Sequence, residues 1–324
     1  MRYIALVILI IGTSFATQAQ NKKWTLRECV EYALQNNISI KQSELDVLQT
    51  DVEKLTAVGN FLPSINGNGN LSANTGLSLN PTTNQFETTT FLSFSGSVNV
   101  GYTLFNGLRN FRQVQRAKLS KLAAQYRLAK MIDDISLFVA NAYLQVLTNK
   151  ANLEVLQSQN KVTEEQIERT AELVDAGVLP QGDLLEIKAT NATEKQNIIT
   201  AENALQISKI SLAQLLLIPD YDTFDIVDEG YNIIDDGISE KPVTELIDAA
   251  KDNRSEIKIA EQNVALAEKD LQLARGAYFP TISAFFGYNT RYADNDPLQR
   301  GFIDQLYLND GIGYGLGLNV PIFN

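Results

Sequence analysis

Apolar residues recur every three or four positions between Thr25 and Val58, which predicts an amphipathic helix. The pattern ends just before Gly59 and Pro63, two residue types that commonly end helices. A second helical stretch runs from Leu108 to Val174 with no proline and no internal glycine. At 1.5 Å per residue such a helix reaches about 100 Å, far beyond an ordinary globular domain, so it needs a partner along its whole length.

The distal part of this stretch has the heptad spacing of a coiled-coil seam, at Val139, Val146, Leu153, Asn160, Ile167 and Val174. The segment from Gly177 to Asp183 breaks the pattern, and we expect Gly177 to end one helix and Asp183 to cap the next. Heptad spacing then resumes at Leu184, Asn191, Ile198, Leu205 and Leu212 and continues toward Ile218. Residues 107–218 are therefore predicted to form an antiparallel helical hairpin.

Two polar residues interrupt this seam, and their positions give a testable register. Folding the hairpin about Leu179 places Asn160 opposite Ile198 and Asn191 opposite Ile167. Each helix would then carry one polar seam position facing an apolar one, which can fix register at some cost in stability.

Strict alternation of apolar and polar residues replaces helical spacing over residues 64–105. One face carries Ile65, Leu71, Ala73, Leu77 and Leu79 and, after a polar turn at residues 80–84, Leu92, Phe94, Val98, Val100, Tyr102 and Leu104. The other face is mostly Asn and Ser, and residues 281–323 repeat the pattern. Each of the four segments exceeds the roughly 9 to 11 residues that a tilted membrane strand needs. We predict membrane strands, although a soluble sheet with one buried face would show the same alternation.

The chain contains an internal duplication. The stretch AVGNFLPSI at 57–65 returns as ARGAYFPTI at 274–282, and the same offset pairs Asn36 with Asn253 and Pro63 with Pro280. A repeat of this length indicates a duplicated domain, here 20–218 and 243–324. The echo of VGYTLFN, which ends at Asn106, is GLNVPIFN at the end of the sequence, so the second copy has no counterpart of residues 107–218. Two explanations are compatible with this: the sequence is a fragment of a longer protein, or the gene product is truncated.

The two copies are joined by an acidic connector, residues 219–242. Its carboxylates are Asp220, Asp222, Asp225, Asp228, Glu229, Asp235, Asp236 and Glu240. A calcium loop does not fit, because Phe224 falls where a ligand belongs and Asp225 where a turn glycine is needed. We therefore predict a solvated connector near the middle of the rod, the equatorial region.

Composition narrows the classes of function. Residues 1–19 have the basic start, short apolar core and small-residue end of a secretory signal peptide. The chain has no histidine and one cysteine, Cys29, which we expect to be a packed core residue. The sequence thus lacks the commonest metal ligand and general base, and we predict no catalytic, cofactor-binding or metal-binding residues and no enzyme activity. A net charge of −11 argues against a nucleic-acid partner.

The ordered set of these features resembles the outer-membrane efflux protein family, the TolC-like exit ducts. The resemblance rests on the helix, the FLP break at 61–63, the hairpin, LFNG at 104–107, the long helix, the G-x5-D tip at 177–183 and the returning helix, in that order and then again. It implies a mainly α fold with membrane β: a homotrimer in which four strands per subunit form a 12-stranded barrel and long antiparallel helices form a periplasmic α-barrel.

The resemblance also implies a function and partners. Such a protein is an outer-membrane channel subunit of a tripartite efflux or type I secretion system in a Gram-negative bacterium, extends into the periplasm, and exports small molecules or proteins passively. Its partners would be outer-membrane lipid, a periplasmic adaptor and an inner-membrane pump. Carried onto this sequence, the adaptor-contact residues at the helical tip are Gly177, Val178, Leu179 and Asp183. The alternative is a soluble periplasmic adaptor or coiled-coil spacer, which gives no reason for four long uncharged strands.

Overall fold

The computed structural model describes residues 23–79, 85–221, 223–230, 237, 240–296 and 298–323. The predicted signal peptide, the predicted turn at 80–84 and much of the connector, including 231–236, lie outside these described residues. The chain forms two compact units, the first made of residues 1–45 and 127–255 and the second of residues 46–126 and 256–324.

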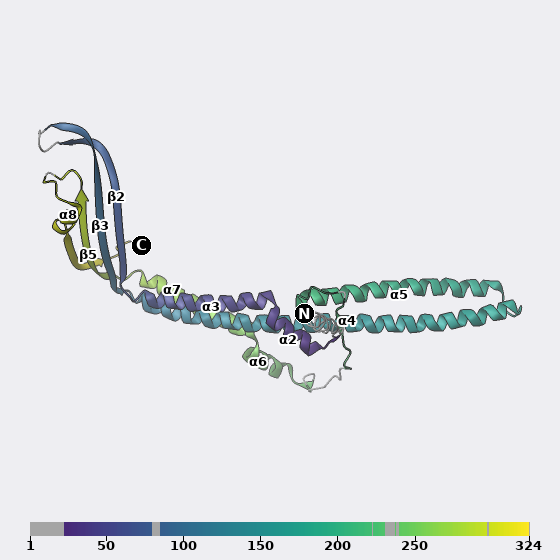
Figure 1. Ribbon diagram of the computed structural model, residues 1–324. Helices are drawn as coiled ribbons and strands as arrows, with labels where there is room; N and C mark the ends of the chain where they lie inside the picture. The colour runs from purple at the N-terminus through teal and green to yellow at the C-terminus, as the bar shows by residue number, and fades with distance from the viewer. Residues whose placement is uncertain are drawn as a thin grey trace, which may run out of the picture. The chain divides into compact units, whose positions relative to one another are not determined.

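Each copy of the duplication opens with the same pair of helices (Figure 1). These are α2 (Leu26–Asn36) and α3 (Ile38–Gly59) in the first copy, and α6 (Val243–Asn253) and α7 (Ser255–Gly276) in the second. In both copies the first helix has 11 residues and the second has 22. The residue between them is extended in both, with φ −62° and ψ 129° at Asn37 and φ −73° and ψ 125° at Arg254. The predicted duplication is confirmed, whereas the single helix predicted from Thr25 to Val58 is wrong.

The break after α2 has a local cause in the sequence. The Asn37 side-chain oxygen accepts hydrogen bonds from the backbone N–H groups of Ser39 at 2.8 Å and Ile40 at 3.4 Å. An Asn that satisfies the first N–H groups of a following helix is a preferred N-cap, and its own backbone is extended rather than helical. One residue therefore ends α2 and starts α3 without a glycine or proline.

The long helix and its return are α4 (Arg109–Asp175, 67 residues) and α5 (Gln181–Leu216, 36 residues). Within the first unit the distal part of α4 and α5 lie antiparallel and side by side (Figure 1). Buried residues of this hairpin include Val139, Val146, Ala201 and Leu212. None of the described helices combines the length and the apolarity required to cross a membrane.

The register of the hairpin differs from the predicted one. The Asn160 side-chain amide donates to the Asn191 side-chain oxygen at 3.2 Å and to a Glu194 carboxylate oxygen at 3.0 Å. The predicted pairing of each Asn with an isoleucine is therefore wrong. A buried amide that faces only an apolar side chain leaves its hydrogen-bonding groups unpaired, and the observed stagger lets the two Asn residues satisfy each other.

The core of the first unit gathers around Tyr143, whose side chain is fully buried. Its hydroxyl lies 3.2 Å from the Trp24 carbonyl oxygen and also contacts the Val227 carbonyl oxygen. These two carbonyls flank a short parallel ladder between β1 (Lys23–Trp24) and β4 (Asp225–Ile226). Cys29 is buried in the same core, as predicted.

The connector contributes to this core. Phe224 and Ile226 are buried, and Asp225 pairs with Lys209 at 2.8 Å. The Asp225 carboxyl has a pKa below its ordinary value: partial burial acts to raise the pKa, but the hydrogen bond and positive charge of Lys209 outweigh it. The prediction of a solvated connector is therefore wrong for this stretch, because the carboxylates alternate with apolar residues that pack inward.

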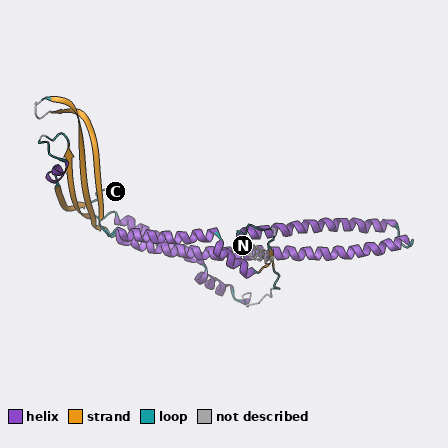
Figure 2. Ribbon diagram, viewed as in Figure 1, coloured by secondary structure: helices purple, strands orange, loops and turns teal. Residues whose placement is uncertain are grey.

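The second unit contains one antiparallel sheet of four strands (Figure 2). They are β2 (Ser64–Leu79), β3 (Phe86–Asn106), β5 (Thr281–Ala293) and β6 (Gly311–Asn319), in the order β2-β3-β5-β6. The central pair joins the two copies, with Val98 opposite Tyr288 and Phe94 opposite Tyr292. The register places apolar residues opposite apolar residues, so most of the apolar positions share one face of the sheet, and Phe91 and Phe285 lie on the other.

Below the sheet, helices α3, α7 and the start of α4 are held together by charged and polar contacts. Arg116 pairs with Asp270 at 2.5 Å and Lys121 pairs with Asp51 at 2.6 Å. Gly107, which joins β3 to α4, has φ +67°, and a side chain there would overlap the carbonyl oxygen of Gly276. Glycine is required at this position because both the positive φ and the contact exclude a Cβ atom.

Candidate functional site

The apolar face of the sheet is exposed in the isolated chain. Its large side chains include Ile65, Leu71, Val98, Tyr314, Leu316 and Leu318, of which Tyr314 is 81% and Leu316 is 72% exposed. Exposed apolar surface of this extent and continuity indicates a non-aqueous partner. The face therefore has the chemistry of a lipid-contacting wall.

The opposite face of the sheet is polar but carries little charge. Ser64, Asn66, Asn68, Asn70 and Ser72 of β2 lie opposite Gly101, Asn99, Ser97, Ser95 and Ser93 of β3. Two of these pairs are bonded across the strands: the Ser64 hydroxyl donates to the Gly101 carbonyl at 3.3 Å, and the hydroxyls of Ser72 and Ser93 lie 2.9 Å apart. A neutral, hydrogen-bonding surface of Asn and Ser suits contact with water.

The two outer strands leave the sheet open. Among the described residues β2 pairs only with β3 and β6 pairs only with β5, so each has one edge of unpaired backbone groups. Such edges are templates for pairing with another chain, and hydrocarbon does not tolerate them. A membrane location would therefore require further strands at both edges.

The helical tip is a compact, ordered turn. Gly177 has φ +73°, its N–H donates to the Val174 carbonyl at 2.9 Å, and the Val178 N–H donates to the Leu173 carbonyl at 2.8 Å. These two bonds form the Schellman arrangement that ends helices at a left-handed glycine. Val178 is 66% exposed at the end of the turn, while Leu179 is half-buried. The predicted role of Gly177 as the end of the helix is confirmed.

The predicted role of Asp183 as the cap of the returning helix is wrong. α5 begins at Gln181, and Pro180 holds the N-cap position without a side-chain bond. Asp183 lies in the first turn, exposed, where a carboxylate interacts favourably with the positive end of the helix dipole. Pro180 has the extended backbone of an N-cap residue, with φ −74° and ψ 149°, so the helix begins earlier than the Asp suggests. Gly177, Val178 and Leu179 therefore lie in the connection between the helices, and Asp183 lies in the first turn of α5.

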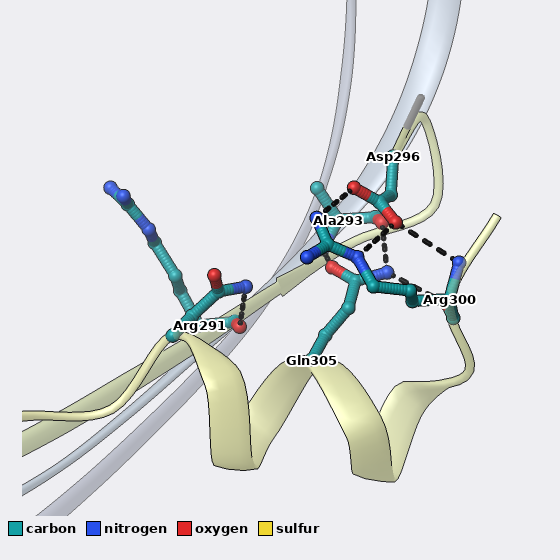
Figure 3. Close-up of polar contacts among 6 residues, drawn as sticks. Arg291, Ala293, Asp296, Arg300 and Gln305 are labelled. Atoms are coloured by element: carbon teal, nitrogen blue, oxygen red, sulfur yellow. Dashed lines mark hydrogen bonds and ion pairs between the residues drawn. The ribbon is translucent and has the colours of Figure 1, made fainter. Parts of the chain in front are cut away.

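The segment between β5 and β6 contains a structured element that the sequence analysis missed. It is a short helix, α8 (Phe302–Leu308), held to the end of β5 by the side chains of Figure 3. Arg300 bonds both carboxylate oxygens of Asp296, at 2.6 and 2.8 Å, and its backbone N–H donates to the same carboxylate. This hydrogen bonding lowers the pKa of Asp296 to about 2. The spacing of Asp296 and Arg300 was the one available signal in the sequence.

Gln305 is the second side chain, after Arg300, that fixes the connection between β5 and β6; this contact of Gln305 with Ala293 is called the Gln305 brace below. Its side chain is 3% exposed, its amide donates to the carbonyl oxygens of Ala293 and Arg300 at 2.9 Å, and its oxygen accepts from the Ala293 N–H at 3.0 Å (Figure 3). The side chain thereby replaces a strand neighbour for the last residue of β5. A cavity of about 550 Å³ lies beside it, lined in part by Ser95, Arg291 and Asn309.

These features match those of a known class of membrane proteins. The model of the outer membrane efflux protein family matches residues 29–216, and the chain belongs to this family. No curated protein matches the chain. The family consists of transport proteins rather than enzymes, which agrees with the composition.

Solved structures of outer-membrane channels share the fold. The Campylobacter jejuni outer membrane channel CmeC matches 94% of this chain with a TM-score of 0.76 at 16% identity. The Vibrio cholerae outer membrane protein VceC matches 92% with a TM-score of 0.71 at 18% identity, and the open state of the Neisseria gonorrhoeae channel MtrE matches 92% with a TM-score of 0.66 at 19% identity. The chain spans 62%, 69% and 64% of these three proteins, respectively. The predicted TolC-like fold, with long antiparallel helices and four strands, is confirmed.

Proposed function

We propose that this chain is a subunit of an outer-membrane channel, the passive exit duct of a tripartite efflux or type I secretion system. The observation that carries the proposal is the sheet of the second unit, with one exposed apolar face, one Asn- and Ser-rich face and two open edges. Hydrocarbon accommodates the apolar face but requires the edges to be paired. Three copies contributing four strands each would close the wall around a water-filled lumen.

Channels of this family are trimers that work with an adaptor and an inner-membrane pump. The adaptor contact in this chain would be the helical tip formed by Gly177, Val178, Leu179 and Asp183. Its support is structural: an exposed apolar side chain, Val178, is presented on a turn whose backbone is fixed by Gly177. A rigid turn with one protruding apolar residue loses little conformational entropy on binding.

Fractionation of cells that produce the protein tests the channel assignment. We expect the mature protein in the outer membrane, migrating on gels as a trimer that dissociates on heating. Recovery only as soluble periplasmic protein would favour the adaptor or spacer alternative and would contradict the channel.

A matched pair of substitutions makes this test specific to the sheet faces. Leu316→Arg places a charge on the exposed apolar face, which costs about 2–4 kcal/mol near the bilayer midplane. Asn68→Arg places the same charge on the polar face, where water can solvate it. The trimer should be lost with Leu316→Arg and retained with Asn68→Arg, and equal behaviour of the two variants would contradict the assigned faces.

A photo-crosslinking residue at Val178 tests the tip. In cells that contain the cognate pump, Val178 should crosslink to a periplasmic adaptor, identified by mass spectrometry. Val155 is the control, because it is 63% exposed on α4 but distant from the tip in sequence. Adaptor crosslinks from Val155 and none from Val178 would overturn the assignment of the tip while leaving the channel assignment intact.

A further inference from the structure

Helix α8 lies on the apolar face of the sheet. The ring centroid of Phe302 is 5.6 Å from that of Phe94 and 5.0 Å from that of Tyr292. Phe94 and Tyr292 are opposite each other in the β3–β5 ladder and belong to the apolar face. The hydroxyl of Thr290, on the same face, donates to the Leu306 carbonyl at 2.6 Å. The helix is therefore fastened outside the wall, on the side expected to contact lipid.

The side of α8 that points away from the sheet is also apolar. Tyr307 is 78% exposed, and Ile303 and Leu308 are each 59% exposed. Leu298, just before the helix, is 72% exposed. Asp304 is the only charged residue of α8. A soluble loop gains nothing by presenting four large apolar side chains to water, whereas a membrane interface accommodates them.

α8 lies where the continuous apolar run of β3 is interrupted. The apolar positions of β3 continue to Leu92 and are followed on that face by Thr90 and Thr88, while Leu77, opposite Thr88, and Phe86 are isolated apolar residues further out. β5 has 13 residues, slightly more than the roughly 9 to 11 that cross the hydrocarbon when tilted. α8 follows the far end of β5, opposite the end at which the strands join the helices. The helix therefore lies at the level where hydrocarbon gives way to headgroups, and Tyr307 is of the residue type enriched there.

A second copy of the chain is a poorer occupant of this surface than lipid. Neighbouring copies would pair with the open edges, which are β2 and β6. α8 instead packs on β5 and on Phe94 of β3, the two central strands. We propose that α8 is an interfacial helix that inserts Ile303, Tyr307 and Leu308 into the outer leaflet and fixes the depth of the sheet in the membrane. This inference rests on the proposed channel function.

Spin labelling of the full-length chain tests the proposal. In a Cys29→Ala background, single cysteines replace Tyr307 on α8, Leu316 on the apolar face and Asn68 on the polar face, and each trimer is reconstituted in phosphatidylcholine–phosphatidylglycerol vesicles. Collision rates with oxygen, which concentrates in hydrocarbon, and with a water-soluble nickel complex are then measured. The oxygen-to-nickel ratio at Tyr307→Cys should resemble that at Leu316→Cys and exceed that at Asn68→Cys several-fold.

Each other outcome contradicts a defined part of the argument. A nickel-accessible label at Tyr307 with a lipid-exposed label at Leu316 would overturn the interfacial helix alone. A label at Tyr307 that is shielded from both reagents would also overturn it, because protein rather than lipid would then cover α8. Water exposure at both Tyr307 and Leu316 would remove the channel assignment and the helix proposal together.

Discussion

The far ends of the two strand pairs differ, although the pairs begin at equivalent positions of the two copies. In the first copy β2 and β3 have 16 and 21 residues and extend past their neighbours. In the second copy β5 and β6 have 13 and 9 residues, and a helix is inserted between them. The β3–β5 ladder accordingly stops at Ser93 of β3, and the remainder of β3 pairs only with β2.

The helices of the two copies, by contrast, have kept equal lengths and the same break. Elements that pack along their length against a neighbour are constrained by every turn, whereas a connection at a sheet end is constrained only at its two attachments. The two copies therefore share the lengths of their helices and the positions at which their strands begin, and these shared elements are called the frame below. The two copies differ at the far ends of their strands.

The largest effect is expected where the two copies meet. Gly59 and Gly276 end equivalent helices, but a Cβ at Gly59 meets nothing within 4 Å, while Gly276 faces Gly107 and Arg109. Gly107→Ala should cost about 3 kcal/mol, since it combines the penalty of a left-handed backbone with overpacking. Gly276→Ala should cost less because the Arg109 side chain can move. Thermal unfolding followed by circular dichroism measures both.

Gly59→Ala is the control for this series. Its free energy of unfolding should stay within about 0.5 kcal/mol of that of the parent. A loss at Gly59 equal to that at Gly107 would mean that the two copies are packed alike at this level, contrary to the contacts described above.

The next largest effect is expected from loss of the Gln305 brace, which lies in the second copy. Gln305→Leu removes the partners of the Ala293 N–H and carbonyl, and a buried unpaired group costs about 1–3 kcal/mol. Hydrogen exchange at Ala293 and along α8 should accelerate accordingly. Exchange in the β2–β3 ladder should not change. Acceleration in both strand pairs would show that the brace stabilises the whole sheet rather than its own connection.

Much of this frame could be predicted from the sequence, because helical spacing and strict alternation are long and regular. The antiparallel hairpin, the four strands and their two faces followed directly from these patterns. The family model and the solved channels agree with that fold. Strand alternation also identified the face that carries Leu316 and Leu318, since side chains of a strand point to opposite sides in turn.

What the sequence did not show depends on single residues or on contacts between distant segments. The break at Asn37 contains neither glycine nor proline, and the pairing of Asn160 with Asn191 depends on a stagger that heptad spacing leaves undetermined. α8 has 7 residues, which is too short for a periodic signal, and its position depends on Phe94 far away in the sequence. The roles at the tip stay predictions, because the turn alone explains Gly177.

A smaller effect on stability is expected from the residue that precedes α3, which differs from the residue that precedes α7. Asn37 caps α3 through its side-chain oxygen, whereas the equivalent Arg254 has no oxygen in its side chain. Asn37→Ala should therefore destabilise the protein by about 1 kcal/mol, the usual worth of an N-cap. Asn37→Asp retains an acceptor and should be nearly neutral. Unfolding midpoints of the two variants measure the difference, and equal losses would assign the effect to something other than capping.

The smallest effect is expected from acid on the connection that carries α8. Hydrogen bonding from Arg300 lowers the pKa of Asp296 from 3.8 to about 2, so the folded loop favours the ionised carboxylate. The stabilisation is fully present above about pH 4 and is lost as the pH falls through 2, because protonation then removes the charge that Arg300 binds. A spin label at Leu298→Cys, in the Cys29→Ala background, should become more mobile over this range.

Arg300→Gln distinguishes this pair from other acid effects. Without the guanidinium, the carboxyl should titrate near its ordinary pKa, so the label at Leu298→Cys should already be mobile at neutral pH and change little below pH 4. A label at Leu316→Cys, outside the connection, should respond in neither protein. If mobility at Leu298→Cys rose equally with and without Arg300, the acid response would belong to the sheet as a whole. The Asp296–Arg300 ion pair would then not be what stabilises the connection at the far end of the β5–β6 pair.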